Sequence, residues 1–251
     1  MNRLAMRTVM LLLTIIFSLG VSGCMKSEAQ TNRNRDPEAI KERMLSHLQQ
    51  KYGEEFVPVS LTLSGFAYNY DNLSAYPKQG TQSDAFEVWG TQMKDGSYRI
   101  SDGYFGKYIR PEYEAAMSGL IEEMYSTFKL YTNFGEGVLP DRLNKETKIE
   151  EIYAPGETVS SDTVVFVKQE AVRNPADVEA SLVELAKKMR EKKLVGFVQL
   201  FVVRNDKYEN IDLQALNAAD DSEYFVGDYK SVMVTPELKI RQNGREVDVD
   251  G

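Results

Sequence analysis

Cysteine and histidine are nearly absent from this sequence, which contains one of each, Cys24 and His47, in 251 residues. A single cysteine cannot form a disulfide within the chain, so the folded part must be stabilised by its core. Zinc sites need several His or Cys ligands, and nucleophilic triads need a histidine beside the nucleophile. Because His47 follows the apolar spacing of a helix, we expect a half-covered residue there, and the sequence predicts neither a metal nor a cofactor.

Motifs that hold phosphates or activate a serine are also absent. The sequence contains no G-x-G-x-x-G, no phosphate-cradling loop and no G-x-S-x-G. Two acidic segments, Asp206–Asp212 and Asn217–Glu223, lack the pattern of a calcium-binding loop, so we interpret them as polar loops. Metal-free carboxylate chemistry is the catalytic route that remains. Glu87 and Asp102 on neighbouring strands are a conceivable catalytic pair. We expect instead that Glu87 lies on a solvated strand face and that Asp102 lies in a turn.

Basic residues are fewer than acidic ones, 30 against 38, which gives a formal charge of −8. Loss of residues 1–23 would remove Arg3 and Arg7 and no acid, leaving 28 against 38, or −10. Nucleic acids and anionic membrane surfaces repel a chain of this charge. We therefore expect no nucleic-acid partner.

Long apolar runs are missing too, apart from Val9–Val21 near the N-terminus. This run has about 13 residues, whereas a membrane-spanning helix needs about 20. Arg3 and Arg7 precede the run and small residues follow it, which is typical of a secretory signal. We interpret residues 1–23 as a signal peptide rather than a membrane-spanning anchor.

The apolar run ends in Val21-Ser22-Gly23-Cys24, which resembles the lipobox of bacterial lipoproteins: an aliphatic residue and two small residues before an obligatory cysteine. Val21 stands where leucine is commoner. The resemblance, which covers residues 1–24, implies that the Cys24 thiol receives a diacylglyceryl group and that a signal peptidase cuts between Gly23 and Cys24. Two acyl chains hold a protein stably on a bilayer. The motif predicts a lipid-anchored protein on the outer side of the cell membrane; a secreted chain with a chance cysteine is the alternative.

Changes in composition divide the rest of the chain into further segments. Residues 24–36 are polar and without apolar periodicity, which predicts a flexible tether. We expect a first α+β domain or subdomain over 37–135, a connection over 136–158, and a second α+β subdomain over 159–251. The expected fold class is α+β, with antiparallel sheets packed by helices in the order α-β-β-β-α followed by β-α-β-β.

Two helices are expected in the first half. Asp36-Pro37-Glu38 has the N-cap, the first-turn proline and the acid of a helix start, and Gly53 ends that helix. Pro111 opens the second helix, whose apolar stripe at spacings of three and four runs on to Tyr131. The predicted buried face of the first helix consists of Ile40, Met44, His47 and Leu48.

Alternating apolar residues predict the strands of the first half, and two glycines interrupt the alternation. The predicted strands are 57–63 with a continuation over 66–70, 85–93, and 98–100. The phase changes at Gly65 and Gly90 indicate β-bulges or bends. Asp95-Gly96 between two alternating runs predicts a hairpin.

The second half has one predicted helix between strands. Asn174-Pro175-Ala176-Asp177 caps this helix, whose apolar stripe is Val178, Leu182, Leu185 and Met189. The predicted strands are 163–167, 195–203 and 224–234, of which 195–203 is apolar nearly throughout and is expected to be central. From Gln242 onward the polar chain end is expected to fray.

Aromatic residues are plentiful, with 14 tyrosines, 11 phenylalanines and one tryptophan. Eight of them crowd the first half: Tyr68, Tyr70, Tyr76, Tyr98, Tyr104, Phe105, Tyr108 and Tyr113. Tyrosine suits both the half-buried face of an antiparallel sheet and the recognition of proteins or sugars. Packing is the favoured interpretation, and an exposed binding patch remains the alternative.

The segments "KYGEEF" (51–56) and "DGYFGKY" (102–108) are similar to those of small lipoproteins of unassigned function from Gram-positive-type envelopes. This resemblance transfers no site residue. We predict a membrane-anchored, extracytoplasmic and non-catalytic binding module that contacts another envelope protein or the cell-wall polymer. A metal-independent, carboxylate-dependent hydrolase of an envelope polymer and a solute-binding lipoprotein are the alternatives.

Overall fold

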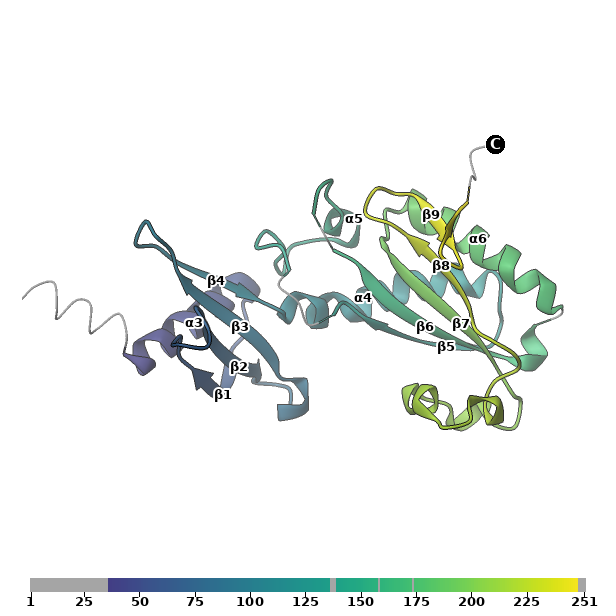
Figure 1. Cartoon of the computed structure of the whole chain (residues 1–251), viewed down its shortest axis with the longest axis horizontal. Coiled ribbons are helices and arrows are strands. Elements are labelled where there is room, and N and C mark those ends of the chain that lie inside the picture. Colours follow the sequence, from purple (N-terminus) through teal and green to yellow (C-terminus); the bar gives the residue numbers. More distant parts are fainter. Residues whose placement is uncertain (1–35, 136–138, 158, 173, 248–251) are drawn as a thin grey trace, which may run out of the picture.

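The computed structural model describes residues 36–135, 139–157, 159–172 and 174–247, and it confirms the α+β class. Within these residues the helices are α3 (Pro37–Tyr52), α4 (Tyr104–Glu122), α5 (Ile149–Ile152) and α6 (Pro175–Glu191). The strands are β1 (Phe56–Thr62), β2 (Asp71–Pro77), β3 (Phe86–Gln92), β4 (Tyr98–Asp102), β5 (Phe128–Asn133), β6 (Ser161–Lys168), β7 (Gly196–Val203), β8 (Lys230–Val234), β9 (Ile240–Gln242) and β10 (Arg245–Glu246). They form two sheets, joined by α4 in an elongated molecule (Figure 1).

The first sheet has the order β1-β2-β3-β4, is antiparallel throughout, and packs one face against α3. The predicted cap of α3 is confirmed, since the Asp36 carboxylate accepts a hydrogen bond from the Glu38 amide at 3.1 Å. The helix ends at Gly53, whose φ of 72° is a left-handed conformation that glycine adopts freely. Its buried side chains are Ile40, Met44, Leu48 and Tyr52.

The order α-β-β-β-α predicted for the first half is one strand short, because four strands, β1 to β4, lie between α3 and α4. Two further strand predictions are wrong in detail. Residues 66–70 belong to the loop between β1 and β2, and β2 begins only at Asp71. Gly90 is no bulge, because it pairs with Asp71 on one side and Ile100 on the other. A Cβ on Gly90 would lie 2.0 Å from the Tyr98 hydroxyl, so the glycine makes room for that ring. The predicted Asp95-Gly96 hairpin joins β3 and β4.

Helix α4 begins seven residues before Pro111, at Tyr104, so the prediction that Pro111 opens the helix is wrong. Gly103 is the N-cap residue, and the Asp102 side chain just before it accepts a hydrogen bond from the first helical amide, that of Tyr104, at 3.0 Å. The helix also ends before Phe128 and Tyr131, which were expected on its stripe and lie on β5. Residues 128–133 form a strand that pairs with β6. This pairing with a distant segment decides their conformation, although the spacing of their apolar residues fits a helix.

The second sheet has the order β10-β9-β8-β7-β6-β5, in which β6 and β7 are parallel and joined by α6. The predicted β-α-β-β order of the second half is therefore present, with β7 in the interior of the sheet. The strand predicted over 224–234 is shorter, beginning at Lys230. The end expected to fray from Gln242 includes β10, which pairs with β9.

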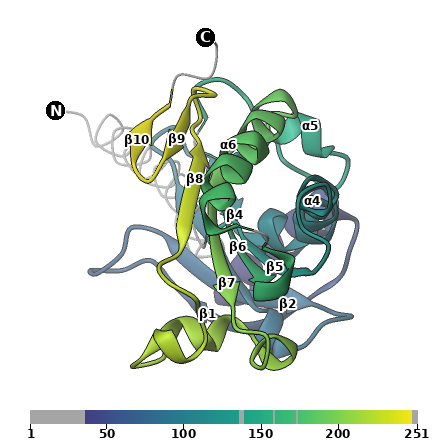
Figure 2. The same cartoon turned by 90° about the vertical axis from the view of Figure 1, so that its right-hand side faces the viewer.

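One hydrophobic core runs through both sheets. It includes Leu48 from α3, Met117 from α4 and Val198 from β7 in a single cluster of buried residues. Both α4 and α6 lie on the same side of the second sheet, as the end-on view shows (Figure 2). A smaller aromatic cluster on the other side packs Phe166 and Phe201 against the segment that follows β7.

Strand β5 falls within the range 37–135 expected for the first subdomain, yet it hydrogen-bonds to β6 of the second sheet. The connection expected over 136–158 contains α5 and contributes buried side chains to the core, namely Leu139, Leu143, Ile149 and Ile152. The boundary between the two subdomains stays a prediction, because α4 packs into the core of both sheets.

Candidate functional site

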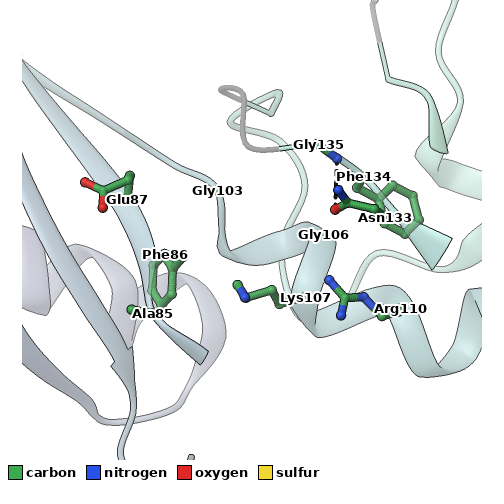
Figure 3. Close-up of a pocket in the computed structure, with 10 residues that line it drawn as sticks. All are labelled: Ala85, Phe86, Glu87, Gly103, Gly106, Lys107, Arg110, Asn133, Phe134 and Gly135. Atoms are coloured by element: carbon green, nitrogen blue, oxygen red, sulfur yellow. Dashed lines mark hydrogen bonds between the residues drawn. The ribbon is translucent and has the colours of Figure 1, made fainter. Parts of the chain in front are cut away.

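A small cavity lies where the first sheet meets α4 and the end of β5, and we call it the junction cavity (Figure 3). Its volume is about 170 Å³. The lining residues are Ala85, Phe86, Glu87, Gly103, Gly106, Lys107, Arg110, Asn133, Phe134 and Gly135. Three segments far apart in sequence therefore build it: the start of β3, the first two turns of α4, and the residues that follow β5.

Helix α4 places two cations side by side on the wall of this cavity. Lys107 and Arg110 are three residues apart, so they project from the same face of the helix. Gly106 lets the chain after β5 approach this face, since a Cβ there would lie 2.8 Å from the Phe134 Cβ. In Figure 3 Lys107 projects from α4 on the side of Phe86, and Arg110 projects on the side of Asn133.

The Arg110 guanidinium has an unsatisfied donor. Its Nε atom is buried and has no hydrogen-bond partner within the described residues. Neither Arg110 nor Lys107 forms an ion pair with a described residue. Buried donors in folded proteins are nearly always satisfied, by protein, water or ligand. Glu87 is the one acid among the lining residues, so the lining carries more positive than negative charge.

The size of the junction cavity limits what it can hold. Pockets for drug-sized ligands range from about 300 to 1,000 Å³, and this cavity is about half the lower limit. It suits one small group with several acceptor oxygens, such as a carboxylate or a phosphate. Arginine recognises both groups through paired N–H donors, and lysine adds a point charge.

Asp102 lies outside the cavity, in a buried cluster that joins α3 to α4. Its carboxylate, which is fully buried, accepts hydrogen bonds from Lys51 Nζ at 2.8 Å and from the Tyr52 hydroxyl at 2.6 Å. Burial and the adjacent carboxylate raise the pKa of Tyr52 far above its ordinary value. The Tyr104 amide is a third donor to this carboxylate. These contacts give Asp102 a structural role, in which it links α3 to the start of α4.

Glu87 and Asp102 do not form a carboxylate pair. Val88 is the cross-strand partner of Asp102, so these two side chains share the face that packs on α3. Glu87, the neighbour of Val88, points to the opposite face, because successive side chains alternate along a strand. The expectation that Asp102 lies in a turn is also wrong, because this residue is buried at the end of β4.

His47 lies half-buried on α3, as expected, beside the buried face rather than within it. Its Nε2 atom is buried and has no hydrogen-bond partner within the described residues. Burial is the main cause that lowers the pKa of His47, and the positive charge of Lys51 adds to it. Asp102 and Asp141 oppose this shift.

The two acidic segments are loop structures, as interpreted from the sequence. The Asp212 and Asp220 carboxylates each cap a short 3-10 helix by accepting a backbone hydrogen bond, and Glu223 pairs with Lys207 at 2.7 Å. In the part of the chain that the structure describes, no group of three or more His, Cys, Asp or Glu side chains is arranged to hold a metal ion.

A second, more open hollow of about 620 Å³ lies between the end of α4 and the start of α6. Four acids line it: Glu122, Glu123, Glu170 and Asp177. Glu123 pairs with Lys188, and Glu170 pairs with Lys168. Among the described residues, neither Glu122 nor Asp177 forms an ion pair, so these two are the acids there whose charge is not offset by a contacting cation.

Most of the tyrosines pack, as the favoured interpretation predicts. Tyr104 and Tyr113 are buried, and the Tyr113 hydroxyl accepts a hydrogen bond from Ser161 at 2.7 Å. Tyr98 donates to Asp71 at 2.6 Å and stacks its ring under the Arg43 guanidinium. Tyr68 is exposed, together with its loop neighbour Phe66.

The sequence predictions missed Lys107 and Arg110. Their i, i+3 spacing is visible in "GKYIRP", but the expected helix start at Pro111 left both residues outside the helix. Cys24 and Gly23, the residues predicted for lipidation and cleavage, lie outside the described residues. No helix in the described part of the chain is long and apolar enough to cross a bilayer.

Comparisons with known proteins assign no family to this chain. No family model matches it, and no curated protein matches it. Among solved structures it is similar to a DUF5037 family protein from Ruminococcus gnavus ATCC 29149, with 15% sequence identity and a TM-score of 0.39. The similarity covers 78% of this chain and 91% of the other.

Proposed function

We propose that this protein is a lipid-anchored, extracytoplasmic binding module that recognises an anionic group of an envelope polymer or envelope protein. The lipobox-like motif ending in Cys24 supports the location. The observation that carries the binding role is the buried, unpartnered Nε of Arg110 beside Lys107 in the junction cavity. The chain as a whole is acidic, so the excess of positive charge in the cavity lining runs against the overall balance.

Location and binding fit together physically. Cell-envelope polymers and protein chain ends present phosphate or carboxylate groups on extended chains. A cavity of about 170 Å³ accepts such a group while the rest of the chain stays outside. A membrane-tethered protein needs only modest affinity for a surface polymer, because tethering raises the effective concentration of the two partners to the order of mM.

Replacement of Arg110 tests the binding role. In the protein as isolated, added inorganic phosphate or acetate should raise the melting temperature, because a ligand that binds only the folded state stabilises it. Arg110→Gln should abolish this rise. Arg245→Gln, which removes the same charge from the exposed strand β10, should retain it. Equal responses of the two variants would contradict an anion site at Arg110.

Replacement of Cys24 tests the location. Cys24→Ala removes the thiol that the lipobox resemblance implies as the acceptor of the lipid. We expect the protein to leave the membrane fraction or to accumulate with its signal peptide uncut. An unchanged membrane fraction together with normal cleavage would refute the anchor.

A carboxylate-dependent hydrolase remains the alternative function, and the structure changes where its acids would be. Glu87 and Asp102 face opposite sides of the first sheet, so that pair does not support it. Glu122 and Asp177 in the open hollow beside α6 are the candidates instead. Among the described residues each site has a buried polar atom without a hydrogen-bond partner, Arg110 Nε in the junction cavity and the Tyr125 hydroxyl in that hollow. Binding is preferred because the atom in the junction cavity belongs to a cation that has a second cation, Lys107, beside it.

A further inference from the structure

Helix α3 starts at one extreme of the molecule, and the predicted tether leads into it. Arg43 lies over the ring of Tyr98 at 5.0 Å, whereas Lys51 contacts Asp102, so the helix runs along β4 from its beginning to its end. The first turn, at Pro37, therefore lies at the end of the sheet where β4 begins (Figure 1). A lipid on Cys24 would hold this end of the domain closest to the bilayer.

Two loops of the first sheet lie at the same end. The loop Leu63–Tyr70 joins β1 to β2, and the turn Met93–Ser97 joins β3 to β4. The outermost pairs, Thr62 with Asn72 and Gln92 with Tyr98, belong to the strand ends that these loops connect. We call the two loops and the first turn of α3 the tether end.

The loop Leu63–Tyr70 displays apolar side chains and carries no acidic or basic residue. Phe66 is fully exposed, Tyr68 is 55% exposed, and Leu63 is 37% exposed. Met93 in the neighbouring turn is 40% exposed. Exposed clusters of large apolar residues mark interaction surfaces, and aromatic side chains favour the interface between water and lipid.

Hydrogen bonds hold this loop in place. The buried carboxylate of Asp71 accepts from the Ser64 amide at 2.7 Å and from the Tyr98 hydroxyl at 2.6 Å. Within the loop, the Gly65 amide donates to the Tyr68 carbonyl at 2.8 Å. The apolar side chains are thus presented on an ordered support, which lowers the entropy cost of docking.

We propose that the tether end docks on the lipid bilayer, with Phe66 and its apolar neighbours in the interfacial layer as a second attachment beside the lipid. This inference rests on the proposed anchor at Cys24. Residues 24–36 span at most about 45 Å when fully extended, so the anchor keeps the tether end within reach of the membrane. The uncharged loop also avoids the repulsion that the acidic domain would meet at an anionic surface.

Thiol labelling tests this docking in the full protein. In the lipidated form the Cys24 sulfur is a thioether, so a cysteine introduced by Phe66→Cys is the one free thiol. Leu213→Cys, at a 43% exposed site after β7, is the matched control. Each variant receives an environment-sensitive fluorophore and is reconstituted in phosphatidylglycerol–phosphatidylcholine vesicles, with or without nitroxide-labelled acyl chains.

We expect a blue shift and nitroxide quenching at position 66, and neither at position 213. Equal quenching at both positions, or none at position 66, would overturn the docking. Protection of position 66 from an aqueous maleimide without quenching by lipid would also overturn it, and would indicate a protein partner.

Failure of the anchor is read separately, in the parent chain. If Cys24 of the parent reacts with maleimide, the lipid is absent and the proposed anchor fails. In that case the labelled variants at positions 66 and 213 are prepared with Cys24→Ser as well and mixed with the same vesicles. Nitroxide quenching at position 66 and not at position 213 would then support the docking without the lipid anchor, and equal quenching or none would overturn it.

Discussion

Arg110 and His47 both have a buried nitrogen without a hydrogen-bond partner in the described chain. Their chemistry differs, because the arginine keeps its charge at any physiological pH, whereas histidine can lose it. The arginine is therefore suited to hold an anion, and the histidine makes the stability of the domain depend on pH.

The stability of the protein should fall as the pH drops through the ordinary pKa of histidine. Burial lowers the pKa of His47 below 6.5 in the folded state, so the unfolded state takes up the proton first. Below about pH 6.5 the free energy of unfolding should fall by at most about 1.4 kcal/mol for each pH unit. The measurement is urea unfolding at intervals between pH 5.5 and 8.

His47→Gln should flatten this dependence. Because His47 is the one histidine in the chain, no second imidazole can mask the difference. The same slope in the variant and in the parent would show that His47 is not the group responsible.

At the scale of elements, we expect substitutions in the contact between α3 and the start of α4 to reduce stability strongly. Lys51, with 8% of its side chain exposed, is paired with the fully buried Asp102. Breaking a buried pair costs about 3–5 kcal/mol, because the remaining charge stays in the interior without a partner. Asp102→Ala should therefore destabilise the protein by about that amount in urea unfolding, and it also removes the acceptor of the Tyr104 amide at the start of α4.

Glu55→Ala is the control for this prediction. Glu55 pairs with Lys78 on the surface, with both side chains more than half exposed, so its loss should change stability little. A loss for Asp102→Ala no larger than that for Glu55→Ala would contradict the structural role of the buried pair.

Elements with local signals were predictable, and those defined by pairing were not. The caps of α3 at Asp36 and Gly53 and the Asp95-Gly96 hairpin are local, and the structure has them where the sequence predicts them. Strand β2 begins with Asp71, and its inward position depends on the flanking strands. Its alternation is too weak to be recognised without those partners.

The junction cavity shows the same division between local and long-range information. At the start of α4 the Tyr104 amide donates to Asp102, whose side chain is also held by Lys51 and Tyr52, far away in the sequence. Without that start, the common helix face of Lys107 and Arg110 could not be recognised. The third wall, at Asn133, requires β5 to pair with β6.

At the scale of the whole molecule, the tether end, the junction cavity and the second sheet follow one another along the long axis. The tether end lies at one extreme, the junction cavity lies where the first sheet meets α4, and the second sheet lies beyond it (Figure 1). If the tether end docks on the bilayer as proposed, the second sheet is the part farthest from the membrane. The cavity would then sit above the bilayer surface, where a polymer chain can reach it.

The contact of Lys51 and Tyr52 with Asp102 also has a mechanical consequence. A partner that grips the protein beyond the first sheet, while the lipid stays in the bilayer, puts the molecule under tension. Along the backbone that tension would pass from Lys51 through 51 residues to Asp102, and so through every strand of the first sheet. The side-chain contacts bridge these two points directly, so the pull passes from α3 to α4 and the strands between them are spared.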